Sequence, residues 1–336
     1  VAVFKGNPEI AGCSIDGNQV GGIYSRLIQT AGSSGDPFYR VSIQQYGGGS
    51  GGGIFLQNIT SQVYRSTFIG NSAAGHGGGI YLYDNSSCDL SNCVVFGNGA
   101  MDNSAPGTGG GISCSGSSLA GARCRIDNNS VGQTVTTTVE TLGIPGSPFY
   151  RTTAYIAGAG LGGGLYVDSS DVCFSDSSFN GNGAAGHGGG VFVSSSECVI
   201  SNCAVVGNSS RDNVTPSSGG GIACRASSFT AVQSDIASNG VGDVFATTLT
   251  TVGSPGDPCY RVTTETSGHG LGGGVFAESS CVTLTACRVI GNASYGDGGG
   301  LYLVSNYDCR VYGSILNANE AVQTRISAAT TQVFDS

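Results

Sequence analysis

The chain has 336 residues, of which 39% are hydrophobic and 10% charged. This composition is rich enough in apolar residues to bury a long core, and it differs from that of disordered chains. The formal charge of −9 and the pI near 4.6 argue against binding to nucleic acid through phosphates. No apolar run approaches the length of a membrane span. The first residues, Val1 to Phe4, show no initiator Met or signal-peptide pattern, which predicts a processed chain or an excerpt.

Three glycines followed by an aliphatic residue recur along the chain, as in Gly77-Gly78-Gly79-Ile80. Each of these aliphatic residues is followed, seventeen or eighteen positions later, by an asparagine. Two marks at a constant separation indicate one structural unit that is repeated. The units start at Ile54, Ile80, Ile112, Leu165, Val191, Ile222, Val275 and Leu301, and the asparagines are Asn71, Asn98, Asn129, Asn182, Asn208, Asn239, Asn292 and Asn319.

Each unit reads as one coil of a single-stranded right-handed parallel β-helix, an all-β solenoid. In Ile80-Tyr81-Leu82 the aliphatic side chains would point to one face of a strand and the aromatic ring to the other. Like positions of successive coils would then stack about 4.8 Å apart. The asparagines, with Asn18 as a ninth member, are predicted to form a ladder at one corner, and the glycines to make another corner.

The coils are grouped in threes. The steps between starts are 26, 32, 53, 26, 31, 53 and 26 residues, so the super-repeat is 110–111 residues long. We therefore predict one continuous β-helix of about nine coils over residues 1–336, with super-repeats at about 1–111, 112–221 and 222–332. Residues 333–336 would start a further coil. The long third coils carry Val/Thr-rich runs around a Pro/Gly turn, which predicts β-hairpins at about 19–50, 130–161 and 240–271.

The paired motifs resemble the passenger repeats of polymorphic outer-membrane proteins and of other β-helical autotransporter and surface proteins. The Phe-x-x-Asn form of that family stands at Phe68 to Asn71 and at Phe179 to Asn182. Valine replaces the phenylalanine at Val95, and Gly-Gly-Gly replaces the family's Gly-Gly-Ala. The resemblance covers nearly the whole chain and implies an extracellular adhesive or structural role, without chemistry.

Catalysis is not the favoured interpretation of the polar residues. Polysaccharide-cleaving β-helices need two or three carboxylates that converge at one place. Here the notable polar residues recur with the super-repeat, as Asp16 does at Asp127 and His76 at His187, which suits a structural role. We predict no catalytic, cofactor-binding or metal-binding residues.

Twelve of the thirteen cysteines fall in columns when they are counted from the coil starts. No C-x-x-C pair is present, so the pattern does not support a zinc or redox motif. The columns suit either buried stacks of small side chains or disulfides between adjacent coils in an oxidising environment. The candidate disulfides are Cys173–Cys198, Cys281–Cys309 and Cys93–Cys124.

Six N-x-S/T sequons occur, at Asn58, Asn85, Asn128, Asn208, Asn213 and Asn292. A glycan on Asn208 or Asn292 would conflict with the ladder, so Asn58, Asn85 and Asn213 are the better candidates for glycosylation.

The aromatic residues of the first strands form pairs in adjacent coils, such as Phe55 with Tyr81 and Tyr166 with Phe192. Such a row could bind sugar rings. The favoured interpretation is that the hairpins cover it, because exposed aromatic rows promote aggregation and Tyr39, Tyr150 and Tyr260 recur in step.

The sequence therefore predicts a non-enzymatic structural protein, extracellular or on the cell surface, that forms a repeating segment of a filament, sheath or surface fibre. Its partner would be a second copy, head to tail, with Val1 and Val3 meeting Val333 and Phe334 in strand phase. Glycans are a further candidate partner. The alternatives are a glycan-binding adhesin and a polysaccharide lyase or glycoside hydrolase.

Overall fold

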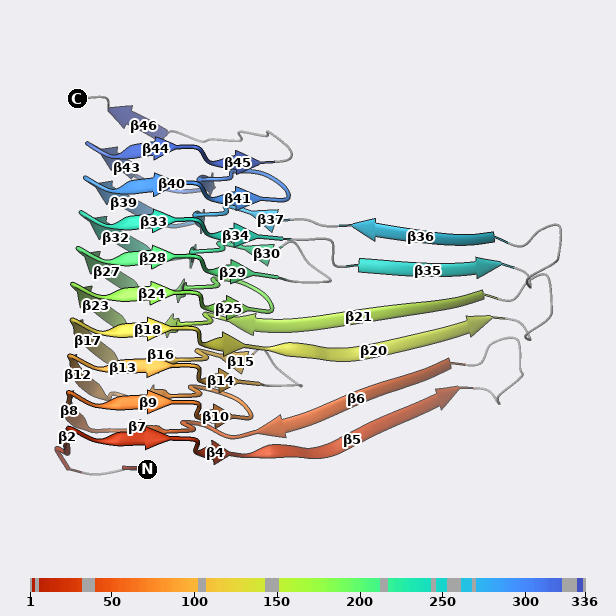
Figure 1. Cartoon of the computed structure of the whole chain (residues 1–336), viewed down its shortest axis with the longest axis horizontal. Coiled ribbons are helices and arrows are strands. Elements are labelled where there is room, and N and C mark those ends of the chain that lie inside the picture. Colours follow the sequence, from red (N-terminus) through yellow and green to blue (C-terminus); the bar gives the residue numbers. More distant parts are fainter. Residues whose placement is uncertain are drawn as a thin grey trace.

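The computed structural model describes residues 2–3, 6–31, 40–101, 107–142, 151–211, 217–242, 246–252, 261–267, 270–321 and 331–334. These residues form parallel strands that coil upward in nine levels, with three pairs of long strands projecting from the same side (Figure 1). The predicted fold class, a parallel β-helix with inserted hairpins, is confirmed. Within the stack, each strand of a coil pairs with the like strand of the coils before and after it, and the end strands pair on one side only.

Four parallel sheets wrap the core. The first sheet contains β1 (Ala2–Val3), β7 (Ile54–Gln57), β11 (Ile80–Tyr83), β16 (Ile112–Ser115), β22 (Leu165–Asp168), β26 (Val191–Ser194), β31 (Ile222–Arg225), β38 (Val275–Glu278) and β42 (Leu301–Val304). The second contains β2 (Glu9–Ala11), β8 (Thr60–Tyr64), β12 (Ser87–Ser91), β17 (Ser118–Ala122), β23 (Asp171–Ser175), β27 (Glu197–Ser201), β32 (Ser228–Val232), β39 (Cys281–Thr285), β43 (Cys309–Tyr312) and β46 (Thr331–Phe334).

The other two sheets are made of shorter strands. The third sheet contains β3 (Ser14–Asp16), β9 (Thr67–Ile69), β13 (Val94–Phe96), β18 (Arg125–Asp127), β24 (Ser178–Asn180), β28 (Ala204–Val206), β33 (Asp235–Ala237), β40 (Arg288–Ile290) and β44 (Ile315–Asn317). The fourth contains β4 (Gln19–Val20), β10 (Ser72–Ala73), β14 (Gly99–Ala100), β19 (Ser130–Val131), β25 (Gly183–Ala184), β29 (Ser209–Ser210), β34 (Gly240–Val241), β41 (Ala293–Ser294) and β45 (Glu320–Ala321).

Antiparallel strand pairs lie within each of the three ranges predicted as hairpins. They are β5 (Gly22–Ala31) with β6 (Arg40–Gly48), β20 (Gln133–Leu142) with β21 (Arg151–Leu161), and β35 (Ala246–Val252) with β36 (Arg261–Ser267). The first two pairs are joined, because β20 also pairs with β6. β15 (Gly107–Thr108) adds to β21, and β30 (Ser217–Ser218) pairs with β37 (Gly270–Leu271).

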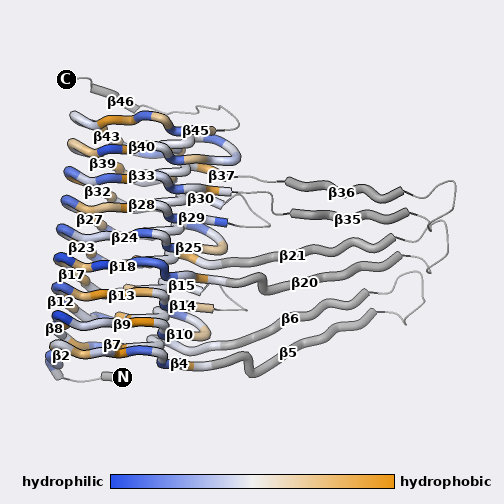
Figure 2. Tube along the Cα trace, in the orientation of Figure 1, coloured by the Kyte–Doolittle hydropathy of each residue, from blue (hydrophilic) through white to orange (hydrophobic). Residues whose placement is uncertain are grey.

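The core is a set of columns that run along the axis of the stack. In the third sheet Phe68, Val95 and Ile126 lie in register, and each is fully buried. Neighbouring residues on the same strands point outward, so buried and more exposed side chains alternate along each strand. Hydrophobic segments, drawn in orange, recur on several levels of the stack (Figure 2). The continuous burial of aliphatic columns is the main favourable term that holds the coils together.

The corners between these sheets share one backbone device. A residue with a positive φ turns the chain, and the residue after it directs its side chain toward the preceding coil. At the asparagine corner, between the third and fourth sheets, Gly181 (φ 64°) precedes Asn182. At the serine corner, between the first and second sheets, Ser169 (φ 50°) precedes Ser170. At the cysteine–serine corner, between the second and third sheets, Arg123 (φ 53°) precedes Cys124.

Candidate functional site

The predicted asparagine ladder is present, and it runs through all nine coils. The backbone N–H and the side-chain Nδ2 of Asn129 donate to Oδ1 of Asn182, at 2.9 and 3.1 Å. The Nδ2 of Asn182 also donates to the carbonyl of Ile126, at 2.8 Å. The seven interior members are at most 1% exposed. Each side chain therefore satisfies backbone groups that water cannot reach, which is a structural role.

A second ladder at the serine corner was missed by sequence reasoning. The N–H of Ser117 donates to Oγ of Ser170 at 3.0 Å, and the N–H of Ser170 donates to Oγ of Ser196 at 3.0 Å. Each Oγ in turn donates to a nearby carbonyl, as Ser170 does to Asp168 at 2.7 Å. The members are Ser86, Ser117, Ser170, Ser196, Ser227 and Ser280, and Asn306 accepts from the last of them.

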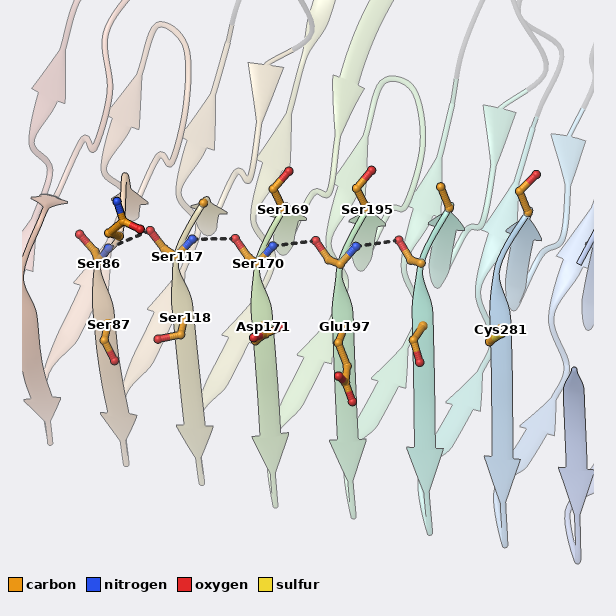
Figure 3. A pocket seen from close by; sticks show the side chains of 17 residues that line it. Ser86, Ser87, Ser117, Ser118, Ser169, Ser170, Asp171, Ser195, Glu197 and Cys281 are labelled. Atoms are coloured by element: carbon orange, nitrogen blue, oxygen red, sulfur yellow. Dashed lines mark hydrogen bonds between the residues drawn. The ribbon is translucent and has the colours of Figure 1, made fainter. Parts of the chain in front are cut away.

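The serine ladder forms the floor of a long open groove of about 940 Å³. Figure 3 shows the ladder crossing the coils, with an exposed row on each side of it. One row holds corner residues such as Ser169 and Ser195, and the other holds the first residues of the second-sheet strands. The groove thus presents hydroxyl groups at the coil repeat, and it is the most site-like surface that the described residues offer.

Two carboxylates stand side by side in this groove. Asp171 of β23 and Glu197 of β27 are register partners on adjacent strands, and both are exposed. Their neighbours in the row are Ser118 and Ser228. The spacing of adjacent strands, about 4.8 Å, is near the separation of about 5 Å that retaining glycosidases use between their two carboxyl groups. The corresponding row positions of the preceding super-repeat are Thr60 and Ser87, so this pair does not follow the repeat.

The repeated aspartates have structural partners instead. Asp127 is 6% exposed, and its carboxylate accepts hydrogen bonds from the N–H of Asn180 at 3.0 Å and from Ser178 at 3.1 Å. Asp16 accepts in the same way from the N–H of Ile69, at 3.1 Å. Within the described part of the chain, no group of three or more His, Cys, Asp or Glu side chains is placed to hold a metal ion.

The disulfides predicted for Cys173–Cys198 and Cys281–Cys309 are wrong. In the register of β23 with β27, Cys173 lies opposite Val199, so Cys173 and Cys198 are one position apart. Adjacent positions of a strand point to opposite faces, and accordingly Cys173 is exposed while Cys198 is buried. Cys281 and Cys309 are displaced in the same way, because Thr283 pairs with Arg310. Cys93 and Cys124 do share a row, and both are free thiols in the structure.

Most of the cysteines are core or corner residues. Burial raises the pKa of Cys88, Cys114 and Cys198 to about 12, so these side chains are neutral thiols at pH 7. At the cysteine–serine corner each coil places either a cysteine or a serine at the same ladder position, and the N–H of Cys203 donates to Oγ of Ser234 at 3.1 Å. This column reads Cys13, Ser66, Cys93, Cys124, Ser177, Cys203, Ser234, Cys287 and Ser314.

Two of the three candidate glycosylation sites lie on accessible corners. Asn58 and Asn85 are exposed and have φ of 55° and 58° at the serine corner. Asn213 lies outside the described residues. Asn208 and Asn292 are at most 1% exposed within the ladder, so a glycan on either would require the corner to open.

The aromatic row of the first sheet is largely covered. Tyr81, Phe192 and Phe276 are 8%, 3% and 4% exposed, and their rings lie 5.4–5.8 Å from those of the paired residues in adjacent coils. Leu161 and Leu271, at the bases of the second and third hairpins, pack against this row. Tyr39, Tyr150 and Tyr260, which were expected to cover it, lie outside the described residues.

The predicted end contact is placed differently by the structure. Val3 pairs with Leu56 in the first sheet, as expected, whereas Val1 lies outside the described residues. Val333 and Phe334 belong to β46, which pairs with Val311 and Tyr312 in the second sheet. The expectation that they begin a coil in the first sheet is therefore wrong. The three glycines that precede the first-sheet strands from Ile54 to Leu301 are missing from the sequence before Val333.

The fold and its ladders define a right-handed β-helix, and comparison with known proteins agrees. A family model described as "Right handed beta helix region" matches residues 52–252, which is more than half of the chain. The chain belongs to this family. No curated protein and no solved structure matches it. No helix that could span a membrane occurs among the described residues.

Proposed function

We propose that this chain is a non-enzymatic β-helical segment of an extracellular filament, sheath or surface fibre, in which coils continue from one unit to the next. The observation that carries the proposal is the state of the asparagine ladder at the two ends of the described stack. Asn18 donates to Asn71, and its own Oδ1 accepts from no described residue. At the other end Asn319 accepts from Asn292, and no described asparagine follows to accept from its N–H. One end offers an acceptor and the other a donor.

The core supports the same proposal. Leu316 continues the fully buried column of Val289, yet it is 47% exposed. At the opposite end Ile15, in the column of Phe68, is only half-buried. β46 extends the second sheet, so the first, third and fourth sheets are the ones that a further coil would complete. A further coil would complete these sheets equally well from a second copy or from one longer polypeptide.

The expected result is concentration-dependent assembly along the axis. Each unit adds about nine coils, or roughly 43 Å at the strand spacing. Because the contact is heterologous and does not close, it produces a fibre. Replacing Leu316 with Arg should abolish assembly, since a charge would be buried in the core column. The measurement is sedimentation velocity together with negative-stain imaging.

The matched control is Ile69→Arg, because Ile69 is 39% exposed on the lateral face of the third sheet rather than at an end. This variant should assemble as the parent does. A parent that remains monomeric at high concentration would refute the proposal, and so would equal loss of assembly in both variants.

A glycan-binding surface protein is the second candidate, and the serine-lined groove is the observation that favours it. The covered aromatic row does not support it. The exposed pair Asp171 and Glu197 is the observation that favours the third candidate, a polysaccharide-cleaving enzyme. For one carboxyl group to act as the acid and the other as the nucleophile, their environments must push the two pKa values apart. Both groups here are exposed, so the groove gives them similar environments. We therefore expect no cleavage.

The test is incubation with a panel of acidic and neutral polysaccharides, with and without calcium. We expect no release of oligosaccharides. If the parent binds to an immobilised glycan and the groove variant Ser195→Arg does not, the result would support the second candidate in place of the first. Product formation that disappears in Asp171→Asn or Glu197→Gln would overturn the proposal that the chain is not an enzyme.

A further inference from the structure

The cysteine–serine corner contains one place where two cysteines are adjacent along the axis. Cys93 and Cys124 occupy the same position of neighbouring coils, because Val94 and Arg125, the next residues, are register partners. Every other step of the column joins a cysteine to a serine. In the second super-repeat, the corresponding step joins Cys203 to Ser234. At this step of the column, the first super-repeat therefore has a Cys–Cys pair and the second super-repeat a Cys–Ser pair.

The two thiols contact one another inside the protein. Cys93 is fully buried and Cys124 is 1% exposed. The side chains of Cys93 and Cys124 interact, which lowers the pKa of Cys93 below its ordinary value and raises the pKa of Cys124, while Sγ of Cys124 donates to the carbonyl of Ala122 at 3.4 Å. The spacing of neighbouring parallel strands, about 4.8 Å, lies within the range of Cα separations, roughly 4.4–6.8 Å, that a disulfide spans. The backbone is thus already placed for a bond between the two sulfurs.

We propose that Cys93 and Cys124 are an oxidisable pair, which a small-molecule disulfide converts from two thiols into a covalent link between adjacent coils. The Cys93 thiolate attacks one sulfur of the oxidant, forms a mixed disulfide and expels one thiolate. The Cys124 thiolate then attacks the Cys93 sulfur, forms the protein disulfide and expels the second thiolate. The two protons of the protein thiols pass to the two released molecules, so the oxidant is reduced to two thiols and the protein loses two hydrogen atoms.

Burial decides when this reaction takes place. An oxidant cannot reach a sulfur that is at most 1% exposed in the folded coil. We therefore expect the pair to react while the coils stack during folding, or when this corner opens locally. The other buried cysteines lack a partner in register: Cys203, for example, has serine on both sides. The link would close the loop between the two coils and restrict the unfolded chain.

The experiment is refolding of the full chain from denaturant with reduced and oxidised glutathione, followed by alkylation of remaining thiols, proteolysis and mass spectrometry. Circular dichroism confirms that each sample has refolded. We expect a cross-link between Cys93 and Cys124 in the parent, and a higher melting temperature for the oxidised than for the reduced protein. In Cys124→Ser, which introduces the residue found at the equivalent position of the second super-repeat, both effects should disappear.

The gain-of-function variant is Ser234→Cys, which should yield a second cross-link, from Cys203 to the introduced thiol. Alkylation of both Cys93 and Cys124 in the refolded parent would overturn the proposal. It would equally be overturned if Cys93 formed a cross-link as readily in Cys124→Ser as in the parent, because the register of the pair would then not direct the reaction.

Discussion

Replacing Gly189 with alanine is expected to lower the free energy of unfolding by about 3 kcal/mol or more, the upper range for forcing atoms into a packed interior. A Cβ at Gly189 would lie 2.3 Å from the carbonyl oxygen of Ser209 and 2.4 Å from that of Gly220. Both are backbone atoms, of β29 and of the glycine corner before β31, and they cannot move without disturbing the backbone hydrogen bonds between coils. Urea denaturation followed by circular dichroism measures the change.

Gly183→Ala is the matched control, because its Cβ would meet only the Oγ of Ser209, at 3.7 Å. This variant should stay within about 0.5 kcal/mol of the parent, as substitutions away from packed sites do. If the two variants were equally stable, close approach of the backbone would not be what excludes a side chain from the glycine corner.

Asn182→Ala should destabilise the protein by about 3 kcal/mol, since buried polar groups left without partners cost roughly 1–3 kcal/mol each. The substitution removes the acceptor for two donors of Asn129 and the donor to the Ile126 carbonyl. Neighbouring coils still hold these groups away from water, because Asn129 and Asn208 are each 1% exposed. Thermal and urea denaturation monitored on the same samples measure the loss.

The control for this variant is Asn317→Ala, at an exposed position of β44. Its stability should match that of the parent within about 0.5 kcal/mol. If Asn182→Ala were also unchanged, the ladder would contribute nothing measurable to the stack.

The coils and the asparagine ladder were predictable because their residue types hardly vary. Corners with a positive φ followed by a buried amide accept few alternatives, so Gly-Asn recurs at Gly70-Asn71, Gly97-Asn98 and Gly181-Asn182. The spacing between the glycines and the asparagine is also constant, because the second and third sheets have nearly the same length in every coil. Periodicity of this kind is visible without knowledge of long-range contacts.

The serine ladder and the faces of the cysteines were not predictable by counting from the coil starts. Serine is abundant throughout the chain, and the serine corner varies in length: Asp84 and Asn85 both have positive φ before Ser86, whereas Ser169 alone precedes Ser170. One extra residue reverses the face of everything after it on the strand. Cys88 is therefore buried and Cys173 exposed, although each lies eight residues after its coil start. Counting from the corner residue instead of the coil start would have assigned the two cysteines to opposite faces of the strand.

The direction of the ladder bonds has a consequence for growth. In every coil the asparagine N–H donates toward the following coil and never toward the preceding one, from Asn18 through Asn292. A fibre built from such units is polar, because two like ends brought together would set donor against donor or acceptor against acceptor. Its two tips should then elongate at different rates. A short peptide that reproduces a single Gly-Asn corner and ends in a charged strand would block one tip and leave the other free to extend.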